Sequence, residues 1–343
     1  MLANNNEAII NKLAKNSVKT NKKQYAILFF TIILSAFMLF CVFTIGMTYL
    51  DSSRLQNTRL NGAEYDIVTM NGFTSEQLNT LQQNENIRSV GIESYAGFIQ
   101  STEYDKTVEI GLLWCDEVFW DNLMSPARTK LDGHYPQNKN ELMVTKDILK
   151  TCGNENLSVG DSLILTYENN TGVYTDEFII SGIWDGYGDT SAGFVSKAFY
   201  DETGYDLKNN GILCIKLNCN YVFPTTIQSI EKSLDFSDRQ IFAPTGYIEN
   251  SFKLLLGICG LALVICLSAY LLIYNILYLS VSGKIRYYGL LQSLGMTKKQ
   301  LVRFIIKQMI LVGILGIFIG NLLGIILCMK LVPYILGILG IST

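Results

Sequence analysis

The sequence has one histidine, His134, and eight cysteines that form no CxxC pair or other ligand-like cluster. Zinc sites built from several imidazoles or paired cysteines are therefore excluded, and we expect His134 to be a solvated loop residue. No GxxxxGKS/T phosphate loop is present, since Gly283 and Lys284 are followed by Ile285. These absences predict a chain without a catalytic, cofactor or metal site, so any ATP hydrolysis must come from another polypeptide.

Acidic residues are nearly absent from both ends of the chain, because 29 of the 30 lie between Asp51 and Glu249. That segment has 14 Lys and Arg and a formal charge of −15, against −3 for the whole chain. Basic residues gather in two other places: Lys12, Lys15, Lys19, Lys22 and Lys23, then Lys284, Arg286, Lys298, Lys299, Arg303 and Lys307. Such stretches can bind nucleic acid, but no nucleic-acid motif accompanies them, so we expect no nucleic-acid partner.

Charge is also absent from three long apolar runs. They are Tyr25–Leu50, Leu254–Gly283 and Gln308–Met329, with 26, 30 and 22 residues. A helix of roughly 20 residues spans the hydrocarbon core, and in lipid the backbone must satisfy its own hydrogen bonds. A signal peptide is the alternative for the first run, but its core exceeds an h-region of about 7–15 residues and no small-residue cleavage site follows cleanly. We therefore predict three transmembrane helices in contact with the lipid bilayer.

The charge distribution predicts the orientation of these spans. Basic flanks face the cytoplasm, which places the N-terminus and residues 284–307 inside the cell and residues 51–250 outside the cytoplasm. Before the first span, Ala8, Ile9, Ile10, Leu13 and Ala14 recur at near-helical spacing. We interpret them as an amphipathic helix on the inner leaflet with its lysines toward anionic headgroups; a frayed basic tail is the alternative.

The acidic segment has the pattern of an α+β domain. Strands are predicted at Tyr65–Met70, Val108–Trp114, Glu141–Val144, Ser162–Tyr167, Glu177–Trp184, Ala192–Val195 and Ile212–Leu217, and helices at Lys146–Cys152, Lys197–Glu202 and Thr226–Leu234. Thr74 and Gln77 have capping-box spacing, and Asn169–Gly172 is a hairpin turn. Four cysteines, Cys115, Cys152, Cys214 and Cys219, fall in this segment and allow three disulfide pairings.

The third run carries Gly316, Gly320 and Gly324 at four-residue intervals. Small residues at this spacing let another helix approach closely. We predict that these three glycines form a helix-packing face, although glycine is common in membrane helices.

The connection between the second and third runs reads Lys284-Ile285-Arg286-Tyr287-Tyr288-Gly289-Leu290-Leu291-Gln292-Ser293-Leu294-Gly295-Met296-Thr297-Lys298-Lys299-Gln300-Leu301. It resembles the cytoplasmic signature of FtsX/MacB-type ABC-transporter permeases at Arg286, Gly289, Leu290, Leu291, Leu294 and Gly295. Tyr287 departs from that signature, because many members have Glu there. In residues 51–250, Leu131–Pro136, Asn140–Val144, Val159–Asp161 and Ile179–Ile183 resemble the core of a MacB-like extracytoplasmic domain.

The resemblance implies a fold and a function. The fold is a multi-pass α-helical membrane protein of the bacterial cell membrane, with an α+β extracytoplasmic domain inserted between the first and second transmembrane helices. The function is that of a permease subunit, a non-catalytic component that couples ATP hydrolysis by a separate, dimeric cytoplasmic ABC ATPase to export or extraction of a peptide, antibiotic or lipid-linked substrate. A second permease copy or half is the other expected partner. A membrane receptor that senses an extracellular ligand through residues 51–250 is the alternative.

The expected coupling element is a short helix whose apolar ridge enters a groove on the ATPase. Its residues are Arg286, Tyr288, Gly289, Leu290, Leu291, Leu294, Gly295 and Met296, with Gly295 ending the helix. An ordinary loop helix resting on lipid is the alternative. The expected segments are 1–24 (cytoplasmic helix), 25–50 (span), 51–250 (extracytoplasmic domain), 251–283 (span), 284–307 (coupling segment), 308–330 (span) and 331–343. Because the last segment is too short to cross the membrane again, we expect a truncated product or the first half of a longer permease.

Overall fold

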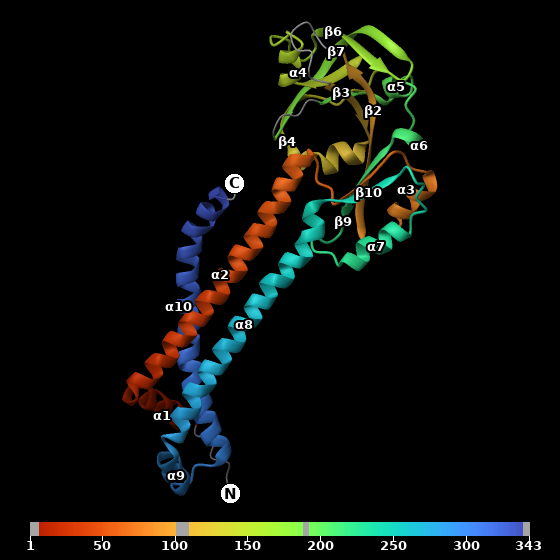
Figure 1. The fold of residues 1–343 in the computed structure, drawn as a ribbon. Helices are drawn as coiled ribbons and strands as arrows, with labels where there is room; N and C mark the ends of the chain where they lie inside the picture. The colour runs from red at the N-terminus through yellow and green to blue at the C-terminus, as the bar shows by residue number, and fades with distance from the viewer. Residues whose placement is uncertain (1–6, 101–109, 188–191, 339–343) are drawn as a thin grey trace. The chain divides into compact units, whose positions relative to one another are not determined.

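A computed structural model describes residues 7–100, 110–187 and 192–338 (Figure 1). The chain divides into two compact units. The first, here called the helical unit, combines Met1–Asp51 with Leu254–Thr343, and the second, the sheet unit, is Ser52–Lys253. Each unit is described by itself.

The helical unit is built from long apolar helices. Its elements are α1 (Glu7–Thr20), α2 (Lys22–Asn61), α8 (Gly246–Ser282), α9 (Ile285–Ser293) and α10 (Lys298–Ile338), of which α2 and α8 continue into the sheet unit. Lys22–Asn61, Gly246–Ser282 and Lys298–Tyr334 are long and apolar enough to cross a membrane, by length and composition. Each of the three uncharged runs lies within one of these helices, apart from Gly283 at the end of the second.

The sheet unit contains ten strands in its described part. They are β1 (Ile67–Met70), β2 (Ile87–Ile99), β3 (Ile110–Cys115), β4 (Arg128–Gly133), β5 (Glu141–Thr145), β6 (Ser162–Asn169), β7 (Gly172–Gly186), β8 (Ala192–Val195), β9 (Ile212–Leu217) and β10 (Ile241–Pro244). The helices are α3 (Ser75–Gln82), η1 (Val118–Leu123), η2 (Ser125–Ala127), α4 (Lys146–Thr151), α5 (Lys197–Tyr200), α6 (Leu207–Asn210) and α7 (Pro224–Lys232).

These strands form one mixed sheet in the order β10-β1-β9-β2-β3-β8-β5-β7-β4, with β6 pairing with β2 and β7. Most neighbours are antiparallel, but β3 pairs with β8 and β5 with β7 in parallel. The two strands of a parallel pair need a long connection between them. Accordingly, strands from the first half of the segment lie beside strands from its second half, as β1 does beside β9 and β3 beside β8. The unit is therefore α+β, as the sequence predicts.

Three apolar clusters fill the sheet unit. One packs α4 and α5 on the strands around Trp114, and a second packs α3 and α7 on β1, β2 and β9. The third surrounds η1 and includes Trp120 and Trp184. Because all three tryptophans of the chain lie in these clusters, intrinsic tryptophan fluorescence reports on the packing of this unit alone.

Within the sheet unit, local sequence patterns predict most of the strands and turns correctly. The seven predicted strands are present as β1, β3 and β5–β9, although Val108 lies outside the described residues. The capping box of Thr74 and Gln77 is confirmed, and the Asn169–Gly172 turn joins β6 to β7 in register. Three strands were missed: β2, β4 and β10.

A buried ion cluster joins β9 to the chain preceding β1. Lys216 Nζ lies 3.1 Å from Glu64 Oε1 and 3.2 Å from Asp66 Oδ2. Asp66 is 2% exposed, and its Oδ2 also accepts the backbone N–H of Leu217 at 2.9 Å. Burial raises the pKa of Asp66, while Lys216 and the Leu217 N–H act against that rise. A charge this deeply buried depends on its partner.

Helix α1 is present, and part of its apolar face packs against other helices of the same unit. Ile10 and Ala14 are buried against Tyr288 of α9 and Phe304 of α10. Glu7 also lies 3.6 Å from Arg303 on α10. The sequence correctly predicts an amphipathic helix here. The structure adds that Ile10 and Ala14 pack on protein while Ile9 is 53% exposed, and the place of α1 on the inner leaflet stays a prediction.

Candidate functional site at helix α9

Helix α9 is bounded by two local motifs that the sequence encodes. At its end, Gly295 has a φ of +98°, its N–H donates to the Gln292 carbonyl, and the Met296 N–H donates to the Leu291 carbonyl. This is the Schellman pattern, which needs a left-handed residue and so favours glycine. Helix α10 then opens with a capping box, in which Thr297 and Gln300 exchange side-chain-to-backbone hydrogen bonds of 3.0 and 3.3 Å.

One face of α9 packs inside the helical unit. Tyr288 is 8% exposed and belongs to the cluster with Ile10, Ala14 and Phe304. Leu291 is half-buried against the same cluster. These contacts fix the rotation of α9 about its own axis.

The other face of α9 is open. Tyr287 is 42% exposed, Leu290 61% and Leu294 80%. Their spacing of three and four residues places them in one stripe along the helix. We call Tyr287, Leu290 and Leu294 the α9 stripe. Figure 1 shows α9 beyond the end of α8.

The structure therefore divides the residues predicted for coupling. Leu290 and Leu294 lie on the open face together with exposed Arg286, Gly289 and Gly295. Tyr288 and Leu291 face the interior, and Met296 is half-buried. Of the three leucines predicted for coupling, Leu290 and Leu294 are thus open, whereas Leu291, on the flank next to Tyr288, packs against the helical unit. Tyr287, where the sequence departs from the FtsX/MacB-type signature, lies on the α9 stripe.

The surroundings of α9 are basic. Arg286, Lys298 and Lys299 are exposed on the same connection. The helical unit has two acidic residues, Glu7 and Asp51. Glu7 lies 3.6 Å from Arg303 and 4.0 Å from Lys307, which leaves the positive charge around the stripe largely uncompensated.

The three predicted packing glycines of α10 lie against α2. A Cβ at Gly316 would fall 2.9 Å from Ile32 Cγ2, one at Gly324 2.5 Å from Phe40 Cδ1, and one at Gly320 2.6 Å from the Ile33 backbone oxygen. Farther along the same contact, Cys41 Sγ and Cys328 Sγ are 3.8 Å apart. Glycine removes the side chains that would otherwise hold the two helices apart.

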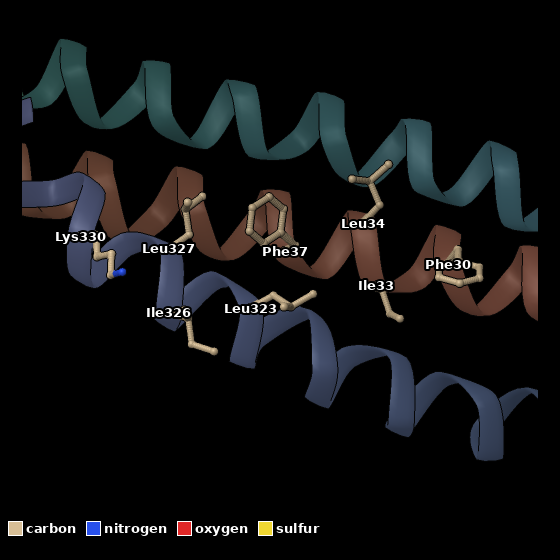
Figure 2. Close-up of a pocket in the computed structure, with 8 residues that line it drawn as sticks. All are labelled: Phe30, Ile33, Leu34, Phe37, Leu323, Ile326, Leu327 and Lys330. Atoms are coloured by element: carbon tan, nitrogen blue, oxygen red, sulfur yellow. The ribbon is translucent and has the colours of Figure 1, made fainter.

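Beside this contact, α2 and α10 border a groove of about 650 Å³. Figure 2 shows its lining residues, with Phe30 at one end and Lys330 at the other. The lining consists of Phe30, Ile33, Leu34, Phe37, Leu323, Ile326, Leu327 and Lys330. Lys330 supplies the one charged group among these eight side chains, as expected for a lysine near the end of a membrane span.

Comparison with known families identifies the region that holds this site. Residues 259–340 match the family model described as FtsX-like permease C-terminal. The likeness to FtsX-like permeases thus concerns this region, about a quarter of the chain. The match begins in α8, includes α9 with its stripe, and ends in residues beyond α10. FtsX-like permeases are membrane components of transporters, and the residues that match them include most of one and all of another of the three helices long and apolar enough to cross a membrane.

Solved structures similar to the permease share little sequence with it. The periplasmic region of MacB from Actinobacillus actinomycetemcomitans has 13% identity and a TM-score of 0.38, covering 57% of this chain and 95% of that chain. The extracellular domain of the noncanonic ABC-type transporter YknZ from Gram-positive bacteria has 13% identity and a TM-score of 0.32, covering 48% and 87%. A domain of a permease protein from Porphyromonas gingivalis has 9% identity and a TM-score of 0.33, covering 53% and 89%. Among curated proteins, no sequence matches the permease.

Proposed function

We propose that this permease is the membrane subunit of an FtsX/MacB-type ABC transporter and that the α9 stripe docks on a separate cytoplasmic ATPase. Motion of the ATPase then passes through the spans to residues 51–250 and drives export or extraction of a peptide, antibiotic or lipid-linked substrate. The observation that carries this proposal is the exposure of Tyr287, Leu290 and Leu294 on a helix whose other face is fixed by packing. A rigidly held apolar stripe is the form in which helices enter grooves on partners.

The proposed orientation places the N-terminus and residues 284–307 in the cytoplasm and residues 51–250 outside it. It is supported by the charge of each segment. We expect a membrane-impermeant maleimide to label a cysteine introduced at Ser158 in intact cells and to spare one introduced at Ser293. Both positions are exposed, and the native cysteines would be replaced so that each variant has one thiol. Labelling of Ser293→Cys but not Ser158→Cys would contradict the orientation.

The docking proposal predicts that Leu294→Asp and Leu290→Asp each remove the ATPase from the purified permease. A carboxylate forced into an apolar groove loses its hydration without gaining a partner, which costs several kcal/mol at a buried contact. Because the permease has no phosphate loop, ATP hydrolysis in the purified sample measures the bound ATPase directly. We expect that activity to fall to background with either variant.

Gln292→Asp is the matched control, because it adds the same charge to an exposed position on the side of α9 away from the stripe. It should retain the ATPase. Leu291→Asp is not a clean test, since Leu291 packs inside the helical unit. Equal ATPase recovery with Leu294→Asp and Gln292→Asp would contradict docking through the stripe. A wild-type permease that purifies in active form without any ATPase would favour the receptor alternative.

A further inference from the structure

Two buried nitrogen donors of the helical unit have no acceptor within hydrogen-bonding distance among the described residues. They are Lys284 Nζ and Gln308 Nε2. Gln308 is 2% exposed and Lys284 is half-buried. Docking of the α9 stripe explains neither donor, because neither residue belongs to the stripe.

Both residues meet the same tyrosine. Lys284 Nζ lies 5.4 Å from the centre of the Tyr25 ring, and the Tyr25 hydroxyl donates to Gln308 Oε1. Tyr25 belongs to the first turn of α2, Lys284 follows the end of α8, and Gln308 is on α10. The two donors therefore lie around one phenol ring where three helices come together.

Among the described residues of the helical unit, no carboxylate is paired with either donor. Glu7 faces Arg303 and Lys307, and Asp51 lies 26 residues along α2 from Tyr25, which is about 39 Å of helix. Burial without a counter-charge lowers the pKa of Lys284. The Tyr25 ring supplies some attraction to the ammonium group, but three ammonium hydrogens and an amide N–H₂ group still need acceptors.

The depth of the site matches that of a lipid headgroup. Tyr25 begins the first uncharged run, Gln308 begins the third, and Lys284 directly follows the second. All three thus stand where hydrocarbon gives way to the polar layer. Lys22 and Lys23 are exposed one turn before Tyr25 and add positive charge. Basic residues between spans at this level suit anionic headgroups.

We propose that Lys284 and Gln308, arranged around Tyr25, bind the phosphate group of an anionic phospholipid. The two free oxygens of a phosphodiester only accept hydrogen bonds, as these donors require. In an anionic lipid no headgroup cation competes with Lys284 for the phosphate charge, whereas the choline of a zwitterionic lipid does. Its acyl chains then continue into the bilayer beside the spans. The lipid phosphate neutralises the ammonium group of Lys284. The lipid thereby links α2, α8 and α10 next to the start of α9.

Native mass spectrometry of the full chain in detergent tests this proposal with defined lipids. We expect phosphatidylglycerol to remain bound about tenfold more tightly than phosphatidylcholine, and Lys284→Met to remove that preference. Lys299→Met removes the same charge from an exposed position of the same connection and should leave the preference unchanged. Lys284→Arg keeps a cation and should retain most of it, even if Lys284→Met is poorly folded.

Three outcomes would overturn the proposal. The first is equal retention of the two lipids by the wild type. The second is an equal loss of preference in Lys284→Met and Lys299→Met, which would show non-specific attraction to the basic surface. The third is displacement of the lipid by millimolar inorganic phosphate, which would assign the site to a free anion. The measurement involves no ATPase, so its failure is distinct from failure of the docking proposal.

Discussion

Replacing Gly320 with leucine should separate α2 from α10 and abolish the cross-link between Cys41 and Cys328. A Cβ at residue 320 would lie 2.6 Å from the Ile33 backbone oxygen and 2.8 Å from Ala36 Cβ. A backbone oxygen cannot move aside as a flexible side chain can, so the helices themselves must part. Overpacking of this kind costs about 1–3 kcal/mol, and the 3.8 Å approach of the two sulfurs depends on the same contact.

The cross-link is measured on the full chain with the other six cysteines replaced. After mild oxidation and unfolding, a maleimide–polyethylene glycol label shifts every molecule with free thiols and spares those with a disulfide. Gly313→Leu is the matched control, because a Cβ there meets no atom within 4 Å and the gain in helix propensity is the same. Gly313→Leu should cross-link like the parent protein. If Gly320→Leu does so at the same rate, the glycine contact is not where the structure places it.

Lys216→Met should strongly destabilise the sheet unit. Removing the cation leaves Asp66, 2% exposed, as an unpaired buried carboxylate, which costs about 3–5 kcal/mol. For a unit of this size the unfolding midpoint should fall on the order of 10 °C. Tryptophan fluorescence of the full chain follows this transition, because all three tryptophans lie in the sheet unit.

Two variants separate the missing charge from other effects at this site. Lys232→Met removes the same charge from an exposed position of α7 and should change the free energy of unfolding by less than about 0.5 kcal/mol. Adding Asp66→Asn to Lys216→Met removes both buried charges and should recover most of the stability. A midpoint for Lys216→Met within 2 °C of wild type would show that Asp66 does not depend on this lysine.

The sequence predicted those strands whose apolar pattern and flanking turns are regular. Strand β2 was missed because it does not alternate: Gly91, Glu93 and Gly97 interrupt it, and its pairings shift register near both Ser89 and Gly97. Strand β4 was missed because Arg128–Gly133 is largely exposed and polar. Neither strand has a local signal strong enough to compete with a loop. Their pairings with strands far along the chain, β2 with β9 and β4 with β7, help to hold them in the sheet.

The candidate site was predictable in its location but not in its orientation. Gly295 and the Thr297–Gln300 pair encode the two ends of the α9–α10 turn in the sequence itself. Which leucines remain open depends on α1, which begins nearly 280 residues earlier and covers Leu291. The unpartnered donors of Lys284 and Gln308 could not be predicted from the sequence either. Each residue type is common at a helix end, and only the structure brings both to Tyr25.

The contact between α2 and α10 also limits the order in which the two units can fold during synthesis. Ile33 and Gly320 are 287 residues apart, so at about 5–20 residues per second a ribosome needs roughly 14–57 s to make the second after the first. Throughout that interval α2 stands in the membrane without the glycine face that receives it, while every residue of the sheet unit is synthesised. The sheet unit can therefore complete its fold during translation, whereas the helical unit must wait for its last helix.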